Sequence, residues 1–252
     1  MRLKDKVVVV TGGNSGIGLA IAQDFKNEGA RGVITGRNSE RLGEASKALG
    51  DDFIAIKADV TNMDDLKNLF EKTHEKFGKI DVVVANAGGG IGEGTFLPFA
   101  DVDEKSFDAM VDVNFKSTFF TVQNALPFLN DASSIILVAS VVIHKGFPGT
   151  SVYTAAKGAV RTLARTLSAE LLDRKIRVNV LSPGPVETPV FEKLGLPPEA
   201  VPETKAFFTS IVPMKRIGQP EEMAKVATFL ASSDSSYILG EEIRADGGVV
   251  NL

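Results

Sequence analysis

The amino-acid sequence predicts an α/β fold: a doubly wound parallel sheet of seven strands with helices on both of its faces. Two patterns indicate this fold. Short apolar runs alternate along the 252 residues with longer segments whose apolar residues recur at helical spacing. Most of the short runs are apolar at consecutive positions, as expected of strands that helices cover on both sides. Such alternation builds βαβ units with right-handed crossovers, and therefore one Rossmann-like parallel sheet.

Seven runs are expected to be the strands, and they are spread over nearly the whole chain. With four to seven residues each, they have the length of ordinary strands. They are Val7–Thr11, Gly32–Gly36, Phe53–Lys57, Asp81–Ala85, Ser134–Ser140, Arg177–Ser182 and Glu242–Ala245.

Helical patterns fill the gaps between these runs. Ile17–Glu28 carries apolar residues at Ile17, Ile21 and Phe25, which share one face of a helix. A second helix is expected at Asn62–Phe77, with Thr61 as its N-cap. Two more are expected at Val152–Leu172 and at Met223–Ala231, the last preceded by a first turn that begins with Pro220.

The chain shows no linker, repeat or low-complexity tract, so residues 1–252 are expected to form a single domain that carries both cofactor site and catalytic site. The segment Pro183–Pro213 is the exception to the regular pattern because it is rich in proline. Long irregular segments in compact domains often form lids or binding loops. We therefore expect a substrate loop at about 188–213, with a solvated insertion as the alternative.

Composition excludes several classes of function. The formal net charge of −4 argues against a surface for nucleic acid or anionic membranes. The absence of cysteine excludes disulfides and thiolate metal sites, and two histidines make a histidine metal cluster improbable, so no metal is expected. No apolar stretch reaches the roughly 18 residues of a membrane span, and the N-terminal residues lead directly into a strand without a signal peptide. A cytoplasmic protein is the expectation.

A glycine-rich turn follows the first predicted strand. Gly12, Gly16 and Gly18 lie between this strand and the next predicted helix. Glycine lets a backbone turn tightly and approach a pyrophosphate closely, and a helix start presents free N–H groups to phosphates. The pattern therefore predicts a site for a phosphorylated cofactor, although glycines also serve turns that bind nothing.

A second pattern indicates proton transfer. Tyr153 and Lys157 are four residues apart, so they share one face of the predicted helix, and Ser140 ends an apolar run thirteen residues upstream of Tyr153. A carbonyl that accepts hydride needs a proton donor and hydrogen bonds to its oxygen. A tyrosine has an ordinary pKa of about 10. We expect the Lys157 ammonium to lower the pKa of Tyr153.

Together these motifs resemble those of the short-chain dehydrogenase/reductase family. Thr11–Gly18 resembles the family's cofactor turn, and Asn86-Ala87-Gly88 resembles its Asn-Ala-Gly element. Asp59-Val60 resembles the pair that contacts adenine, and Pro183-Gly184 with Thr188 resembles the segment that holds the nicotinamide end. The resemblance implies a nicotinamide cofactor bound by Gly12, Asn14, Ser15, Gly16, Ile17, Gly18, Arg37, Asn38, Asp59, Val60, Asn86, Ala87, Gly88, Tyr153, Lys157, Pro183, Gly184, Val186 and Thr188.

The same resemblance implies a catalytic tetrad, which matches Asn114, Ser140, Tyr153 and Lys157. Tyr153 is then the general acid in reduction and the general base in oxidation. Ser140 orients the substrate oxygen, and Lys157 also holds the nicotinamide ribose. Asn114, expected in a long helix, helps to hold a water that links Lys157 to solvent. His144 is expected to be a solvated loop residue, with a place in the substrate cleft as the alternative.

The second predicted strand bears on cofactor choice because it ends Thr35-Gly36-Arg37-Asn38, without an acidic residue at its tip. NAD binders usually place a carboxylate there, which hydrogen-bonds the ribose hydroxyls. Here Gly36 is expected to leave space and Arg37 to offer a bidentate cation to a 2′-phosphate. NADP(H) is therefore favoured, with NAD(H) as the alternative.

The predicted activity is interconversion of a small ketone and a secondary alcohol, by a carbonyl reductase or alcohol dehydrogenase. Phe96, Phe147, Phe191 and Phe207 indicate an apolar pocket that would suit aryl or alkyl ketones. A sugar or polyol dehydrogenase and a non-catalytic nucleotide-binding regulator are the alternatives. The family resemblance also implies a homotetramer.

Overall fold

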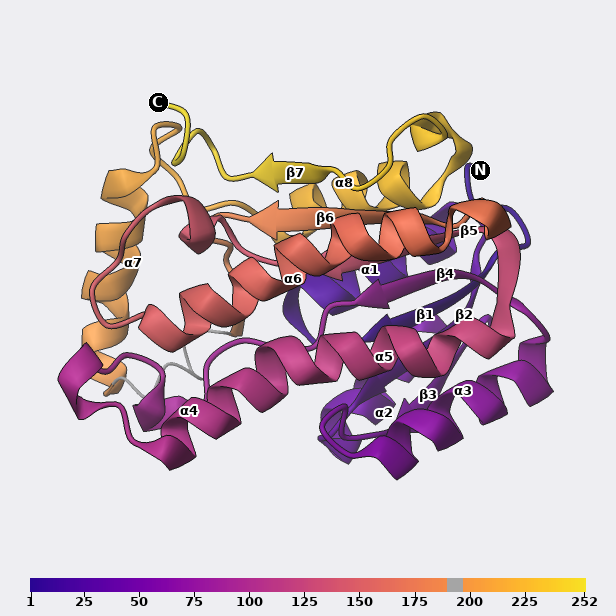
Figure 1. Ribbon diagram of the computed structural model, residues 1–252, viewed down its shortest axis with the longest axis horizontal. Helices are drawn as coiled ribbons and strands as arrows, with labels where there is room; N and C mark the ends of the chain where they lie inside the picture. Colours follow the sequence, from indigo (N-terminus) through magenta and orange to yellow (C-terminus); the bar gives the residue numbers. More distant parts are fainter. Residues whose placement is uncertain (190–196) are drawn as a thin grey trace.

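The computed structural model describes residues 1–189 and 197–252. Its centre is one seven-stranded sheet in the order β3-β2-β1-β4-β5-β6-β7, and every neighbouring pair is parallel. Helices cover both faces of this sheet (Figure 1). The predicted fold class, a doubly wound parallel sheet of seven strands, is confirmed.

All seven predicted strands form, with small differences at their ends. The strands are β1 (Val7–Thr11), β2 (Arg31–Gly36), β3 (Phe53–Lys57), β4 (Ile80–Ala85), β5 (Leu129–Val138), β6 (Arg177–Pro183) and β7 (Glu242–Ala245). The prediction was wrong for β5, which begins five residues before Ser134 and ends two residues before Ser140. Ser140 therefore lies in the connection beyond the strand, where its side chain is available to a site.

One face of the sheet is covered by α1 (Gly16–Asn27), α2 (Ser39–Leu49) and α8 (Pro220–Ala231), which lie behind the sheet in Figure 1. Phe25 of α1 and Leu230 of α8 pack there against Val8 and Val10. Because side chains alternate along a strand, Val7 and Val9 contribute to the opposite face. This explains why β1 is apolar at consecutive positions.

The other face is covered by α3 (Met63–Phe77), α5 (Ser117–Ala125) and α6 (Ser151–Glu170), which lie side by side in front of the sheet in Figure 1. Phe70 of α3 and Val160 of α6 are fully buried in this second cluster. The first helix residue and N-cap of α3 were predicted one position too early. Asn62, not Thr61, is the N-cap, since its side chain accepts hydrogen bonds from the N–H groups of Asp64 and Asp65.

Between β4 and β5 the chain forms one long helical segment with an irregular middle. It consists of α4 (Glu104–Val111), a π-helical turn η3 (Asp112–Lys116) and α5. A π-turn inserts an extra residue into an α-helix and often occurs at functional sites. Asn114 lies in this turn and is fully buried. The structure thus places Asn114 in a long helical segment, as expected.

The proline-rich segment Pro183–Pro213 is more regular than predicted. After β6 it contains a 3₁₀ turn, η8 (Pro198–Ala200), and the helix α7 (Val201–Ile211). Pro202 does not break α7 because it lies in the first turn, where its missing N–H has no intrahelical partner to lose. Phe191 lies outside the described residues.

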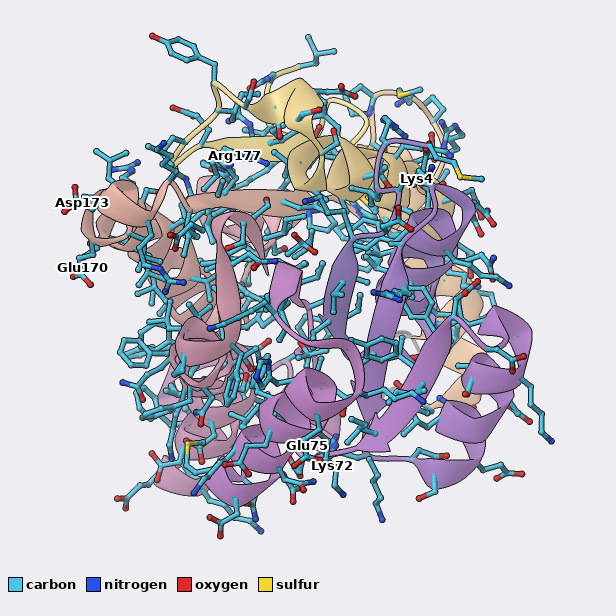
Figure 2. The ribbon with its side chains drawn as sticks, turned by 90° about the vertical axis from the view of Figure 1, so that its right-hand side faces the viewer. Lys4, Lys72, Glu75, Glu170, Asp173 and Arg177 are labelled. Carbon is cyan, nitrogen blue, oxygen red and sulfur yellow. The ribbon has the colours of Figure 1, made fainter. Side chains whose placement is uncertain are left out.

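The two ends of the sheet differ. Figure 2 looks at the end where the strands begin, and shows charged side chains such as Glu170 and Asp173 pointing outward there. Arg177, at the start of β6, donates hydrogen bonds of 2.9 and 3.1 Å to the carbonyl groups of Leu230 and Ser232 at the end of α8. The opposite end, where the strands finish, carries α7 and the loops of the site (Figure 1). Among the described residues, none of the helices combines the length and apolarity that crossing a membrane requires.

Candidate active site

A cavity of about 1080 Å³ opens at the carboxyl ends of the strands. It spans the point between β1 and β4 at which the strand order reverses, where doubly wound sheets bind their ligands. All nineteen residues predicted to hold the cofactor line this cavity, as do Ser140, Tyr153 and Lys157. Of the predicted site residues, Asn114 alone does not line it, because it lies beneath the surface.

The glycine turn forms a cradle that larger residues would fill. Gly12 has a φ of +64°, which L-residues rarely adopt. A Cβ built on Gly18 would lie 2.3 Å from the carbonyl oxygen of Gly12, so the turn and the start of α1 touch through backbone alone. Ser15, the N-cap of α1, makes no side-chain cap hydrogen bond with any described residue. The first N–H groups of α1 are therefore left for an anion, and this cradle fits the pyrophosphate of a dinucleotide.

Thr11 and Asn86 hold this turn against the loop after β4. The Thr11 hydroxyl accepts hydrogen bonds of 3.0 Å from the N–H groups of Asn86 and Ala87 and donates to the Val84 carbonyl. The Asn86 side chain donates to the Thr11 carbonyl at 2.8 Å. Because its side-chain amide donates to the glycine turn, Asn86 both fixes the position of that turn and lines the cavity.

Two arginines line the cavity just beyond the end of β2. Arg37 is 72% exposed and lies 3.9 Å from the Asp59 carboxylate, a separation at which an exposed pair contributes little. Arg41, which the sequence reasoning missed, lines the same part of the cavity from the first turn of α2. The predicted space beside Gly36 was wrong, because a Cβ there would lie 2.7 Å from Cγ of Asn14, whose side chain fills it.

Asp59 was predicted to contact adenine. Its carboxylate accepts hydrogen bonds from the N–H and the hydroxyl of Thr61, at 2.9 and 2.7 Å. Its own N–H donates to Asp65 in α3. Asp59 therefore shapes the turn before α3, whereas Asn62 is the N-cap of that helix. Asp59 and Val60 both line the cavity.

Tyr153 and Ser140 meet at the inner end of the cavity. Tyr153 is in the first turn of α6, and Ser140 caps the 3₁₀ turn η5 (Val141–His144) by accepting a hydrogen bond from the Val142 N–H. Burial raises the pKa of Tyr153 above its ordinary value of 10, and a hydrogen bond with Ser140 opposes this only in part. The predicted lowering of the Tyr153 pKa by groups of the protein was wrong. Loss of hydration destabilises the phenolate more than its polar contacts in the protein stabilise it.

Lys157 lies one turn further along α6 and is 3% exposed. Its Nζ donates a 2.9 Å hydrogen bond to the Val138 carbonyl and lies 5.9 Å from the centre of the Tyr153 ring. Burial lowers the pKa of Lys157 to about 8. Its ammonium therefore faces the backbone of β5 and the tyrosine ring together, and its proton is held less tightly than that of a solvated lysine.

Asn114 holds the loop after β4 from below. Its side-chain oxygen accepts a 2.8 Å hydrogen bond from the Gly89 N–H, and its Nδ2 donates to the carbonyls of Gly89 and Met110. Both amide protons are thus used, and one acceptor position on the oxygen is left. The predicted contact with a relay water is untested, whereas a positioning role for Gly89 is plain from these bonds.

His144 does not line the cavity. Its Nε2 lies 2.9 Å from the Glu242 carboxylate, which also accepts hydrogen bonds from Arg161 and from the Ser182 hydroxyl. Burial raises the pKa of Glu242, but the hydrogen bonds from Ser182 and His144 and the nearby positive charges outweigh this and hold it below the ordinary value. His144 is therefore not a freely solvated residue but part of an ion-paired cluster that fastens the loop after Ser140 to β7.

Aromatic residues surround the remaining part of the cavity. Phe96, Phe147 and Phe207 line it as predicted, and Phe208 joins them. Sequence reasoning also missed Glu203, Thr204 and Val249, since nothing in their local pattern distinguishes them. They reach the cavity only because α7 and the C-terminal segment fold over the strand ends.

Such a fold, with a dinucleotide cradle at the strand reversal and a tyrosine, a lysine and a serine beside it, defines a nicotinamide-dependent oxidoreductase. Comparison with known proteins gives the same class. A family model described as enoyl-(acyl carrier protein) reductase matches residues 12–250. A solved structure described as a short chain dehydrogenase/reductase family protein superposes with a TM-score of 0.86 at 35% identity, covering 100% of both chains.

Two curated relatives cover nearly the whole chain. The 3-oxoacyl-[acyl-carrier-protein] reductase FabG of Thermotoga maritima is 40% identical, over 99% of this chain and 100% of its own. The glucose and ribitol dehydrogenase of Daucus carota is 37% identical, over 99% of this chain and 86% of its own. The chain belongs to the short-chain dehydrogenase/reductase family and is an NAD(P)-dependent oxidoreductase.

Proposed function

We propose that the protein is an NADP(H)-dependent oxidoreductase that interconverts a ketone and a secondary alcohol, with Tyr153 as its acid and base. The observation that carries this proposal is that the hydroxyl-bearing residues Tyr153 and Ser140 line the same cavity, near enough for Ser140 to affect the pKa of Tyr153. Two hydroxyl groups that converge in this way offer two hydrogen bonds to one substrate oxygen. Lys157 lines the same cavity one helical turn away.

In the reducing direction the proposed step is a concerted addition of hydride and proton across the carbonyl. When bound, a nicotinamide cofactor would supply the hydride for the new C–H bond. The π bond of the carbonyl breaks toward oxygen, and Tyr153 gives its proton to that oxygen while Ser140 donates a hydrogen bond to it. The tyrosinate that remains is stabilised by the Lys157 ammonium and regains a proton from solvent.

The raised pKa of Tyr153 keeps the phenol protonated at neutral pH, which is the form that reduction requires. It also makes the phenol a weaker proton donor, so nearby positive charge must favour the phenolate during the reaction. Oxidation of an alcohol needs the phenolate, which is scarce below the pKa, and is therefore expected to accelerate as the pH rises. Charge on the cofactor also contributes, because an oxidised nicotinamide is positive and favours the phenolate.

NADP(H) is proposed as the preferred cofactor because of the charges at the tip of β2. Arg37 and Arg41 both line the cavity there, and guanidinium groups bind phosphate through paired hydrogen bonds. Asp59 is the opposing feature, since it lies near Arg37 and repels a phosphate. NAD(H) therefore stays the alternative, which direct comparison of the two cofactors decides.

A sugar or polyol dehydrogenase is the second candidate, favoured by the likeness to the glucose and ribitol dehydrogenase. The likeness to a 3-oxoacyl reductase favours ketone reduction instead. The aromatic lining of the cavity agrees better with an apolar ketone than with a polyol, which needs many polar partners. A non-catalytic regulator is disfavoured because tyrosine, lysine and serine are all present at the cavity.

A homotetramer and a cytoplasmic location complete the proposal. Exposed large hydrophobic side chains support assembly. Phe107 and Phe119 lie exposed on α4 and α5, and Tyr237 and Leu239 lie exposed just before β7. Light scattering coupled to size exclusion measures the mass directly, and a monomer would contradict the tetramer. Fractionation of the producing cells tests the location.

The activity itself is tested with purified protein, one nicotinamide cofactor at a time, and a panel of ketones, secondary alcohols and polyols. We expect ketone reduction with a higher kcat/KM for NADPH than for NADH. A higher kcat/KM for NADH would overturn the cofactor assignment. Oxidation of polyols without reduction of any ketone would favour the second candidate, and binding without turnover would favour the regulator.

A further inference from the structure

Helix α7 turns its apolar side toward the cavity and not toward the protein core. The residues that line the cavity follow a helical repeat from the N-cap of α7 to its end: Ala200, Glu203, Thr204, Phe207, Phe208 and Ile211. Positions spaced by three and four residues form one face of a helix. No residue of α7, all of which lies within the described part of the chain, is buried. Helix α7 therefore contributes a largely apolar wall to the cavity instead of a buried core face.

The opposite side of α7 is attached to the segment that follows β6. Lys205 forms an ion pair with Glu187, next to Thr188, which lies against the glycine turn at Gly16. Glu187 itself is tied by its N–H to the Gly218 carbonyl. This attachment places the apolar face of α7 as a wall of the same cavity that holds Tyr153 and the dinucleotide cradle.

Aromatic rings reach the cavity from three separate segments. Phe96 comes from the loop after β4, Phe147 from the loop after η5, and Phe207 with Phe208 from α7. Phe207 is 53% exposed and Phe96 40% exposed. The rings of Phe207 and Phe208 lie 5.6 Å apart at an interplanar angle of 62°. The edge of one ring therefore lies near the face of the other, an arrangement that aromatic rings prefer. A flat aromatic ligand can extend this arrangement, whereas a flexible chain cannot.

Charge restricts the ligand further. Among the described residues that line the cavity, the charged ones are Arg37, Arg41, Asp59, Lys157 and Glu203. The first three lie at the cofactor end, and Lys157 is hydrogen-bonded beside Tyr153. Glu203 is the charge on the α7 wall. A substrate with a carboxylate or phosphate would be repelled by Glu203, and no cation of the described lining residues lies on that wall to offset it.

From these observations we propose, resting on the proposed reductase function, that the substrate is a neutral ketone carried on a fused aromatic ring system. Its rings lie against Phe207 and Phe208, and its carbonyl oxygen lies at Tyr153 and Ser140. Glu203 disfavours anionic analogues. The cavity of about 1080 Å³ lies at the upper end of the roughly 300–1,000 Å³ of ligand pockets and extends from the dinucleotide cradle to α7.

The test compares kcat/KM for three ketones with NADPH: 2-tetralone as the fused-ring ketone, cyclohexanone as the single-ring ketone, and an acetoacetyl thioester as the linear one. We expect 2-tetralone to exceed both others by at least about tenfold, the value of one good aromatic contact. In Phe207→Ala the ratio of 2-tetralone to cyclohexanone should fall by about the same factor. The matched control is Phe99→Ala, an exposed phenylalanine outside the cavity, which should keep wild-type rates and ratio.

The charge is tested with a tetralone that carries a carboxylate on its far ring. The wild type should disfavour it relative to 2-tetralone, and Glu203→Gln should reduce that discrimination by about fivefold, the scale of one interaction between partly exposed charges. Equal rates for the linear and fused-ring ketones, or an unchanged ratio in Phe207→Ala, would overturn the inference while leaving the reductase function in place. Absence of turnover with every ketone would instead defeat the proposed function.

Discussion

The Nζ of Lys157 donates a 2.9 Å hydrogen bond to the carbonyl oxygen of Val138, the last residue of β5. This bond joins the helix that carries Tyr153 to the strand that leads into Ser140. The lysine thereby fixes the distance between the two hydroxyl groups of the site as well as supplying charge. Its burial has a measurable consequence for stability.

Replacing Lys157 with methionine should change the pH dependence of stability. The pKa of Lys157 is about 8 in the folded protein and 10.5 in the unfolded chain. Between these values the unfolded chain binds more protons, so the lysine's contribution to stability rises with pH across this window. The free energy of unfolding of the wild type minus that of Lys157→Met should increase by about 3 kcal/mol from pH 7 to pH 11. Urea titrations at several pH values measure this difference, and a flat or falling difference would contradict the burial of the charge.

Replacing Asn114 with alanine should cost much more stability than a similar change nearby. Asn114 is buried, and its loss leaves the Gly89 N–H and carbonyl without their partner, at about 2–4 kcal/mol. Asn124→Ala is the matched control, because the side chain of Asn124 makes one hydrogen bond within the described part of the chain, to the Phe120 carbonyl. Chemical unfolding compares the two variants. Equal losses would show that Asn114 does not hold the loop.

Two glycine variants should shift stability in opposite directions. In Gly18→Ala the new methyl would lie 2.3 Å from the Gly12 carbonyl oxygen, so the turn must move and dinucleotide binding should weaken. Gly43→Ala adds a methyl in the middle of α2 with no heavy atom within 4 Å. It should stabilise the protein by about 0.5–1 kcal/mol, since alanine favours helix. Thermal unfolding and titration with NADPH check both. Tight NADPH binding by Gly18→Ala would contradict the cradle.

Removing the cations at the tip of β2 should weaken NADPH use selectively. Arg37→Ala and Arg41→Ala should each lower kcat/KM for NADPH by about 10- to 100-fold, the value of a charge-assisted hydrogen bond, and leave NADH nearly unaffected. Arg31→Ala is the control, since Arg31 is exposed at the opposite end of the same strand. Parallel loss with both cofactors would mean that these arginines do not read the 2′-phosphate.

The sequence predicted the sheet well because its signal is local. Consecutive valines in β1 indicate a strand that helices cover on both faces, wherever it lies in the chain. By contrast, α7 was missed because the prolines around it resemble those of a loop, although Pro202, the one proline within α7, occupies a first-turn position that tolerates proline. Sequence spacing also could not reveal Arg41 or Glu203 as cavity residues, since their place depends on how helices pack over the strand ends.

The error about the pKa of Tyr153 has a similar origin. Spacing correctly places Lys157 and Tyr153 on one face of α6, and both line the cavity. It does not show how much water surrounds the phenol, and burial is the larger effect. The same holds for His144, whose partner Glu242 is 98 residues away in the chain. Local sequence patterns indicate which residues are catalytic, whereas tertiary packing determines their pKa values and their partners.

The most direct test of the proposed mechanism is the turnover of Tyr153→Phe. This variant keeps the ring and its packing but has no proton to give. The account predicts that its kcat for ketone reduction falls by about 100-fold or more, as expected when a general acid is lost, while the Kd for NADPH changes little. Tyr237→Phe, which removes the hydroxyl from the exposed second tyrosine, should behave as the wild type. Near-wild-type turnover in Tyr153→Phe would contradict the account.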